Sequence, residues 1–215
     1  MRPSPLTTAS VEHPLQRDAD ATAAKLQAQQ VQLHGENVPW ATTGALVLAA
    51  LFLGVQWRAI PHGALLAWLA ALLAVLGWRG ALWAWQRRQP PAGSQSTVWL
   101  LRYRINFAAH GMVWAAASAL PLPDGEPMQL ALLVIMLAGI CASNFILNAF
   151  DLTAALLFGV PTMGALALRL GLAGDGVQAL MGLAVLLALG FFAAIGRRAH
   201  RMVRENALLR LAESR

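Results

Sequence analysis

Six runs of apolar residues follow one another along the chain, and short polar segments separate them. The runs cover residues 40–57, 64–85, 98–120, 128–148, 152–172 and 177–195. Each run is close to the roughly 20 residues that a helix needs to cross the hydrocarbon core of a bilayer. Prolines, glycines and charged residues fill the segments between the runs, as is typical of turns. The pattern predicts an all-α, polytopic membrane helix bundle with about six transmembrane helices.

The composition agrees with this pattern. Hydrophobic residues make up 58% of the chain and charged residues 12%, whereas soluble domains average about 25% charged residues. The formal net charge is +6, and a basic balance can indicate nucleic-acid binding. Most of the arginines, however, stand at or near the ends of the apolar runs, where they set membrane topology. We therefore expect a lipid bilayer as the partner, and no nucleic acid.

The segment before the first apolar run divides into two parts. Residues 1–17 contain three prolines among serines and threonines, which predicts a disordered N-terminus. Residues 18–35 are rich in helix formers and end at Gly35, which predicts a cytoplasmic or interfacial amphipathic helix. This helix either lies on the membrane surface or its own domain, or forms a dimer seam. The seam would use Ala23, Leu26, Gln30 and Leu33, which have a/d-like spacing.

The last 20 residues, 196–215, follow the sixth run and alternate arginines with apolar residues. We predict that they extend the sixth span as a cytoplasmic, signalling-type helix, so that one continuous helix runs from about Val177 to about Ala212. This extension either lies on the membrane surface as a plain helix or forms a short homodimer seam at a/d spacing. The residues of this seam are Ala199, Met202, Asn206 and Leu209.

Basic residues also predict the orientation of the bundle. Two clusters are separated by an even number of spans, so both can lie on the cytoplasmic side, while the loops after the third and fifth runs carry acids and no basic residue. This places both termini in the cytoplasm. The anchors are Arg87 and Arg88 after the second run, and Arg197, Arg198 and Arg201 after the sixth.

Polar residues inside the apolar runs are candidates for a site, because such groups are costly in a membrane and face the interior of a bundle. Three of them share a face near the end of the fourth run, and three more lie near the start of the third. Neighbouring spans run in opposite directions, so the two sets can meet at similar depth. They are either packing hydrogen bonds, worth about 0.6–2 kcal/mol each, or a functional polar network. The set is Arg104, Asn106, His110, Asn144, Asn148 and Asp151.

Catalytic and cofactor chemistry is not indicated. The sequence has no Gly-rich phosphate loop, no His-Glu-x-x-His motif and no nucleophile elbow. His62 and His110 are expected at different depths, which disfavours a haem or metal site in the bilayer. We therefore expect no enzyme activity, no metal and no cofactor. Pro161, inside the fifth run, is a candidate hinge or a packing feature.

The order of several short motifs resembles the N-terminal membrane modules of bacterial sensor proteins, notably diguanylate cyclases and sensor histidine kinases. The third run begins WLLRYRINF and continues with Gly111–Trp114, and the break LPDGEP follows it. The small-residue-rich LAGICASN, the element Phe158–Pro161 and the closing RRAHRMVRENALLRL complete the likeness. It covers the chain from about Ala24.

The resemblance implies a bacterial inner-membrane protein that senses a signal and passes it through the last helix to a cytoplasmic output domain, as a homodimer. The sequence contains no Gly-Gly-Asp-Glu-Phe or Glu-Ala-Leu motif and no kinase boxes. We therefore expect the output on a domain absent here, or on a partner kinase or cyclase. Two other classes stay open. One is a small transporter or channel, and the other is a structural membrane protein.

Overall fold

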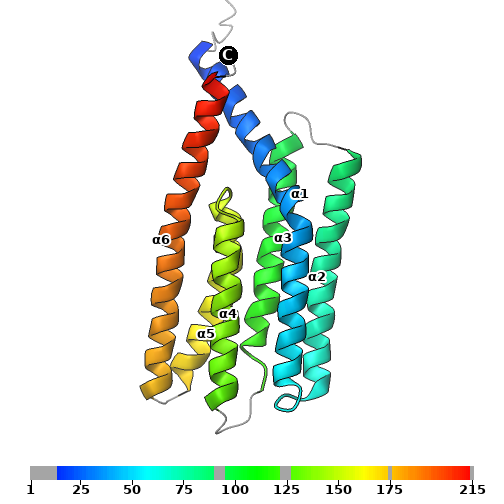
Figure 1. Cartoon of the computed structure of the whole chain (residues 1–215), viewed down its shortest axis with the longest axis vertical. Coiled ribbons are helices and arrows are strands. Elements are labelled where there is room, and N and C mark those ends of the chain that lie inside the picture. Colours follow the sequence, from blue (N-terminus) through cyan, green and yellow to red (C-terminus); the bar gives the residue numbers. More distant parts are fainter. Residues whose placement is uncertain (1–13, 90–94, 122–126, 174–175, 214–215) are drawn as a thin grey trace, which may run out of the picture.

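The computed structural model describes residues 14–89, 95–121, 127–173 and 176–213. These residues form six α-helices, which run side by side along the long axis of a single bundle (Figure 1). The predicted all-α helical bundle is therefore confirmed. The helices are α1 (Pro14–Gln56), α2 (His62–Arg88), α3 (Gln95–Ala117), α4 (Pro127–Leu147), α5 (Leu152–Leu172) and α6 (Gly176–Glu213).

Five of the helices, α1, α2, α4, α5 and α6, are long and apolar enough to cross a membrane. The chain is thus a multi-pass helical membrane protein with five candidate spans among its described residues. The remaining helix, α3, is less apolar because it carries Arg102, Arg104, Asn106 and His110. Whether α3 is a sixth span depends on how its polar side chains are shielded.

The shielding of α3 is extensive. The helix packs against α5, α2 and α1, and its buried residues include Tyr103, Asn106 and His110. The closest approach is to α5 at Gly111, where an added Cβ would lie 2.6 Å from the carbonyl oxygen of Phe158. Glycine is required there, since the backbone of the neighbouring helix leaves no room for a side chain. Helix α3, which lacks the long apolar stretch of a candidate span, is therefore covered by its neighbours.

Aromatic side chains pack α1, α2 and α3 together in the main core. The ring of Trp68 lies 4.8 Å from that of Phe52 and 5.1 Å from that of Trp114, measured between centroids. The Trp68 indole also donates a hydrogen bond to the carbonyl oxygen of Val113, at 2.8 Å. A buried tryptophan N–H that finds a partner costs little, so these rings stabilise the core without an unsatisfied donor.

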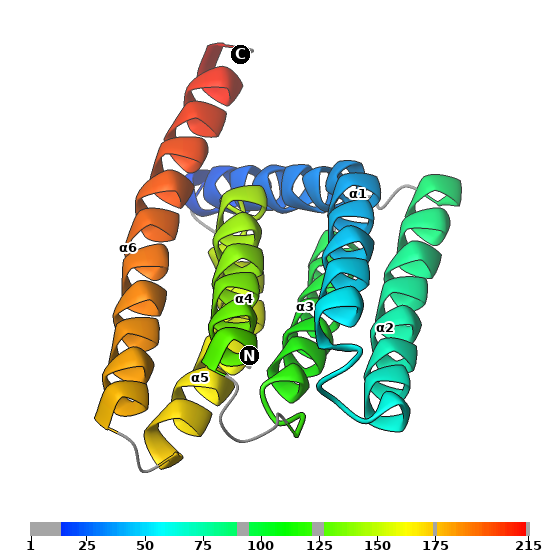
Figure 2. The same ribbon diagram turned by 60° about the horizontal axis from the view of Figure 1, so that its bottom comes forward.

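The prediction that a first helix ends at Gly35 is wrong, because α1 continues through Gly35 and Pro39 to Gln56. Figure 2 shows that α1 bends: its first half lies across one end of the bundle, and its second half runs along the other helices. Pro39 supplies a cause, since it removes a helical hydrogen bond and its ring crowds the preceding turn. Gly35 permits close contact with α2, because an added Cβ would lie 2.9 Å from the Gln86 amide.

The predicted disordered N-terminus needs a second correction. Most of it, residues 1–13, lies outside the described residues. Residues 14–17 belong to α1, which begins at Pro14 and not at residue 18. Proline suits this position, because the first turn of a helix does not use the missing N–H group.

The prediction of one long last helix is confirmed. Helix α6 runs without interruption over 38 residues, from Gly176 to Glu213, and its final part extends past the ends of α4 and α5 (Figure 1). Two glycines bring its first part close to the bundle. An added Cβ would lie 3.0 Å from the Ala167 carbonyl oxygen at Gly182, and 3.0 Å from the Phe145 ring at Gly196.

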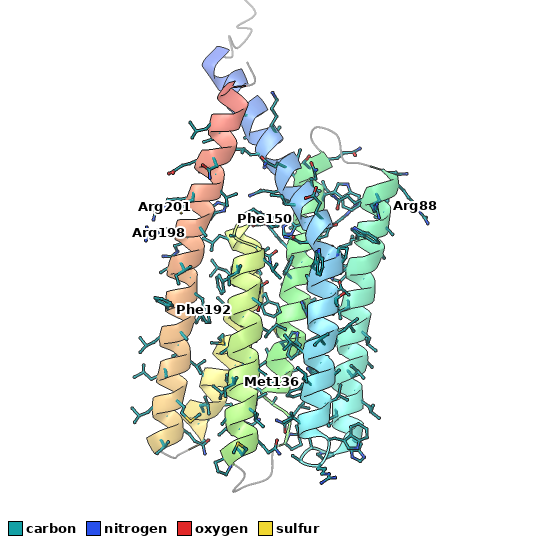
Figure 3. All side chains as sticks on the ribbon, in the orientation of Figure 1. Arg88, Met136, Phe150, Phe192, Arg198 and Arg201 are labelled. Carbon is teal, nitrogen blue, oxygen red and sulfur yellow. The ribbon has the colours of Figure 1, made fainter. Side chains whose placement is uncertain are left out.

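The predicted basic anchors gather at one end of the molecule, which we call the arginine-rich end. Arg88 closes α2, and Arg198 and Arg201 lie on α6 at the same end (Figure 3). The first half of α1 lies across this end. The turn between α4 and α5, residues 148–151, also lies there, with Phe150 at the end of α4 nearest to these arginines (Figure 3).

Candidate functional site

The α4–α5 turn carries the most highly connected carboxylate that the structure describes. Asp151 is the N-cap of α5 and accepts a hydrogen bond from the Ala154 amide at 3.3 Å. Arg104 of α3 donates to it from Nε and Nη2, both at 3.0 Å. His34 of α1 lies 3.1 Å from its Oδ2. Burial opposes ionisation of this carboxyl, but the hydrogen bonds from His34 and Arg104 outweigh burial and hold the Asp151 pKa below its ordinary value.

Further bonds from α1, and a contact from α6, also hold this turn. From α1, Gln30 donates to the Phe150 carbonyl oxygen at 2.7 Å, and Asn37 donates to that of Leu147 at 3.0 Å. From α6, His200 lies with Nδ1 at 3.2 Å from the Ala149 carbonyl oxygen, which can only accept. The α4–α5 turn therefore contacts α1, α3 and α6 together, and α6 reaches it just before leaving the bundle.

His34 ties this turn to α2 and α3. Its ring stacks on Tyr103 with the centroids 5.1 Å apart, and meets Phe150 edge-on at 4.7 Å. The Tyr103 hydroxyl donates to Gln86 of α2, whose amide donates to the Val31 carbonyl oxygen at 3.0 Å. A chain of hydrogen bonds and ring contacts thus joins α1, α2 and α3 to the α4–α5 turn at the arginine-rich end.

A second cluster surrounds Arg79, which lies within α2 and is 2% exposed. Its Nε donates to the Asn106 side-chain oxygen at 2.8 Å, and its guanidinium lies 4.5 Å over the centre of the Phe107 ring. The Asn106 amide in turn donates to the Val75 carbonyl oxygen at 3.1 Å. Among the described residues no carboxylate forms an ion pair with Arg79. Its charge is held by neutral acceptors and a π face, an arrangement that is rare inside membranes and often functional.

His110 stands between two donors. Arg79 Nη2 lies 3.0 Å from its Nδ1, and the Trp114 indole lies 3.0 Å from its Nε2. A neutral imidazole accepts at only one nitrogen. One contact is therefore a hydrogen bond at any moment, and the tautomer of His110 decides whether the acceptor faces α2 or its own helix.

Asn144 of α4 and Asn148 of the turn form a third group. Asn148 donates to the Asn144 side-chain oxygen at 2.9 Å, and Asn144 donates to the Ala155 carbonyl oxygen of α5 at 3.0 Å. These hydrogen bonds connect the end of α4 to α5 beside the turn. A cavity of about 10 Å³, lined by His34, Arg79 and Asn148 among others, lies between the three groups. It has room for about one water molecule.

The six residues predicted as one polar network are thus distributed over three neighbouring groups. Arg104 joins Asp151, Asn106 joins His110 around Arg79, and Asn144 joins Asn148. Arg79 and His34, which hold two of these groups, were not among the six predicted residues. Arg79 carried a readable signal, since it is a charge inside an apolar run. His34 carried none, because its partner Asp151 is 117 residues away.

Two motifs from the sequence meet at the α3–α5 contact. The Thr162 hydroxyl lies 2.8 Å from the Phe158 carbonyl oxygen and 3.1 Å from that of Gly111, and it can donate to either. Helix α5 continues through Pro161 without a break. The role of Pro161 as a hinge stays a prediction.

Comparison with known proteins adds no constraint to this geometry. No protein-family model, curated protein or solved structure matches the chain. Its function has to follow from the contacts of its own residues.

Proposed function

We propose that the chain is a membrane sensor module that passes a signal through α6 to a cytoplasmic output domain, carried on a longer chain or on a partner kinase or cyclase. The observation that carries this proposal is α6, a single helix of 38 residues that begins inside the bundle and continues beyond it. A continuous helix converts a shift inside the membrane into a shift outside it. The resemblance to bacterial sensor modules supports the same function.

The coupling between bundle and α6 would lie at the α4–α5 turn. His200 of α6 contacts Ala149 in the turn. Asp151 of the same turn is bonded to His34 on α1 and to Arg104 on α3. A change in any of these bonds would alter the contact that α6 makes as it leaves the bundle. If such a turn has two discrete conformations, a signal can shift the population from one to the other.

The proposal includes six membrane crossings. Helix α3 has 23 residues and so a length of about 34 Å, which is sufficient to span. Its polar groups are covered by α1, α2 and α5, which lowers the cost of placing them in a bilayer. The gathering of basic anchors at one end supports a cytoplasmic location for both termini, in a bacterial inner membrane.

The proposed assembly is a homodimer through the end of α6. Met202 and Leu209, two positions of the predicted seam, are 57% and 63% exposed. Apolar side chains so exposed on a helix that extends beyond the bundle need a partner or a lipid surface. Asn206 stands between them and would set the register of a two-helix seam.

A reporter experiment tests the function. A cytoplasmic reporter that works only as a dimer is fused after Arg215, and its output is compared for wild type, His200→Leu and Arg201→Gln. His200→Leu removes the bond to the turn, worth about 1 kcal/mol, and should change the ratio of active to inactive reporter about fivefold. Arg201 is exposed beside His200 and serves as the matched control.

The outcome that contradicts the proposal is a reporter whose output is indifferent to growth conditions, to His200→Leu and to Asn148→Leu, while the protein stays folded in the membrane. Asn148→Leu is included because it acts on the turn from the α4 side and leaves α6 untouched.

A small transporter or channel is the second candidate, and the buried Arg79 cluster favours it. The cavity beside this cluster, about 10 Å³, is small for a substrate path. Flux measurements in liposomes separate the two functions. Ion or proton flux that Arg79→Met abolishes would support a transporter.

A further inference from the structure

A cleft of about 770 Å³ lies between the first half of α1 and the final turns of α2, at the arginine-rich end. It belongs to none of the three buried groups, although Gln86 forms part of its wall. Polar residues outnumber apolar ones on its α1 side, whereas most of the lining surface as a whole is apolar. The lining residues that matter here are Lys25, Gln32, Glu36, Trp83 and Arg87.

The charges in this cleft suit a phosphate with further donors beside it. Lys25 is the only lysine in a sequence with 15 arginines, and it faces the same cleft as Arg87. The Arg87 guanidinium lies 4.9 Å over the centre of the Trp83 ring, which holds it at the wall. Glu36 accepts a hydrogen bond from Gln32 at 2.9 Å and keeps oxygen lone pairs for a ligand hydroxyl.

Apolar, exposed faces lead away from the cleft along both helices. On α2, Arg87, Gly80 and Leu73 are seven residues apart and share a face. A Cβ added at Gly80 would meet nothing within 4 Å, and Leu73 is 48% exposed. On α1, Leu46 lies seven residues after Pro39 and is 41% exposed. Acyl chains can lie along these faces while a headgroup occupies the cleft.

The depth of the cleft fits a membrane–water interface. Trp83 lines it, and Trp40, which directly follows the cleft residue Pro39, is 77% exposed. Tryptophans gather at the headgroup level of bilayers, and basic pockets beside transmembrane helices bind anionic headgroups. We propose that this cleft binds one anionic phospholipid of the phosphatidylglycerol type, with Lys25 and Arg87 on its phosphate and Glu36 on its glycerol hydroxyls. This proposal is independent of the signalling function.

The single lysine makes the proposal directly measurable. The full chain is placed in nanodiscs of phosphatidylcholine, with or without phosphatidylglycerol, and is treated with an amine-acetylating reagent. Mass spectrometry of the peptide that contains Lys25 gives its rate of acetylation. A headgroup on the Lys25 amine should slow acetylation about fivefold, the effect of one basic side chain at an anionic surface.

The matched variants are Arg87→Gln, inside the cleft, and Arg88→Gln, exposed next to it and outside the lining. We expect Arg87→Gln to remove the protection by phosphatidylglycerol and Arg88→Gln to keep it. Equal protection in both variants would reveal a general surface effect and overturn the proposal. Equal protection by free glycerol phosphate in phosphatidylcholine discs would reveal a soluble phosphate site, and would overturn it as well. Melting temperatures of both variants in phosphatidylcholine discs verify that they fold.

Discussion

Helices α3 and α6 present opposite surfaces to their surroundings. Helix α3 is too polar to count as a span by its composition, yet Tyr103, Asn106 and His110 are buried on it. Helix α6 contains one of the most apolar stretches, yet large residues on it such as Leu187 and Phe191 are 67% and 63% exposed. In a soluble protein this distribution would be unstable. In a bilayer it is the expected one, because lipid solvates α6 and cannot solvate α3.

The comparison also separates two ways of holding a helix. Helix α3 is fixed by bonds with defined partners, such as Arg104 to Asp151 and Arg79 to Asn106. Helix α6 is held mainly by packing, extensively against α5 and less against α4, with close approaches at Gly182 and Gly196 and with His200 at the turn. A helix held by packing more than by directional bonds can slide against its neighbours at a lower cost, which suits the proposed transmitter.

The largest effect is expected where α3 meets α5. In Gly111→Leu the new side chain would enter the Phe158 backbone, which cannot move aside as a side chain end can. We expect a loss of more than about 3 kcal/mol in the free energy of unfolding in micelles. Gly139→Leu is the control, since a Cβ there meets nothing within 4 Å. Equal stability of the two variants would break the contrast between inner and outer helices.

A smaller but specific loss is expected in the Arg79 cluster. Asn106→Leu removes an acceptor from a buried guanidinium, which should cost about 1–3 kcal/mol or more of unfolding free energy. Replacing both residues, in Arg79→Met with Asn106→Leu, removes the unpaired charge and should recover much of this loss. Denaturation of the two single variants and the double variant measures the coupling. Additive losses would show that the two side chains do not depend on each other.

The Asp151 carboxylate at the turn should make the free energy of unfolding depend on pH in the acid range. Because the Asp151 pKa is lowered in the folded state, its ionised form stabilises the fold above the ordinary value of about 3.9, and this contribution is lost as the pH falls below it. Asp151→Asn should lose about 1–3 kcal/mol at neutral pH and should show a flatter acid profile. The measurement is the free energy of unfolding as a function of pH. Glu36→Gln, which changes an exposed carboxylate, is the control. Parallel acid profiles for wild type and Asp151→Asn would contradict this role.

The smallest effect is expected on the lipid-facing side of α6. Leu187→Ala should change the free energy of unfolding by no more than about 0.5 kcal/mol. Leu137→Ala on α4, at a fully buried position, should cost about 2–5 kcal/mol. Thermal unfolding of both variants in one detergent sharpens the contrast. A large loss for Leu187→Ala would identify this face as a protein contact and not a lipid contact.

Hydropathy alone was sufficient to place most of the helices. The fifth run, 152–172, coincides with α5, and the others differ from their helices by a few residues, apart from the ends of α1 and α6. Long apolar segments are read reliably because one physical requirement, the thickness of the bilayer, sets their length. The long α6 was predictable for a related reason, since no proline or glycine pair interrupts its arginine-rich extension.

The contacts of the site were less predictable. Gly35 indicated the end of a helix, yet α1 continues through it and through Pro39, because its first half gains contacts on the bundle such as Gln30 to Phe150. The pairing of His34 with Asp151 depends on how distant helices cross, which local sequence does not encode. Polar residues within the spans could be identified as inward-facing, but their partners could not.

The coupling between the α4–α5 turn and α6 is the claim on which the proposed function depends most. Spin labels at Leu209→Cys, an exposed position on α6, report the distance between two copies in a bilayer, in a background where the buried Cys141 is replaced by alanine. We expect Asn148→Leu, which acts on the turn from α4, to shift this distance distribution, and Gly139→Leu to leave it unchanged. An identical distribution in all three proteins, or the absence of any distance between copies, would contradict the claim.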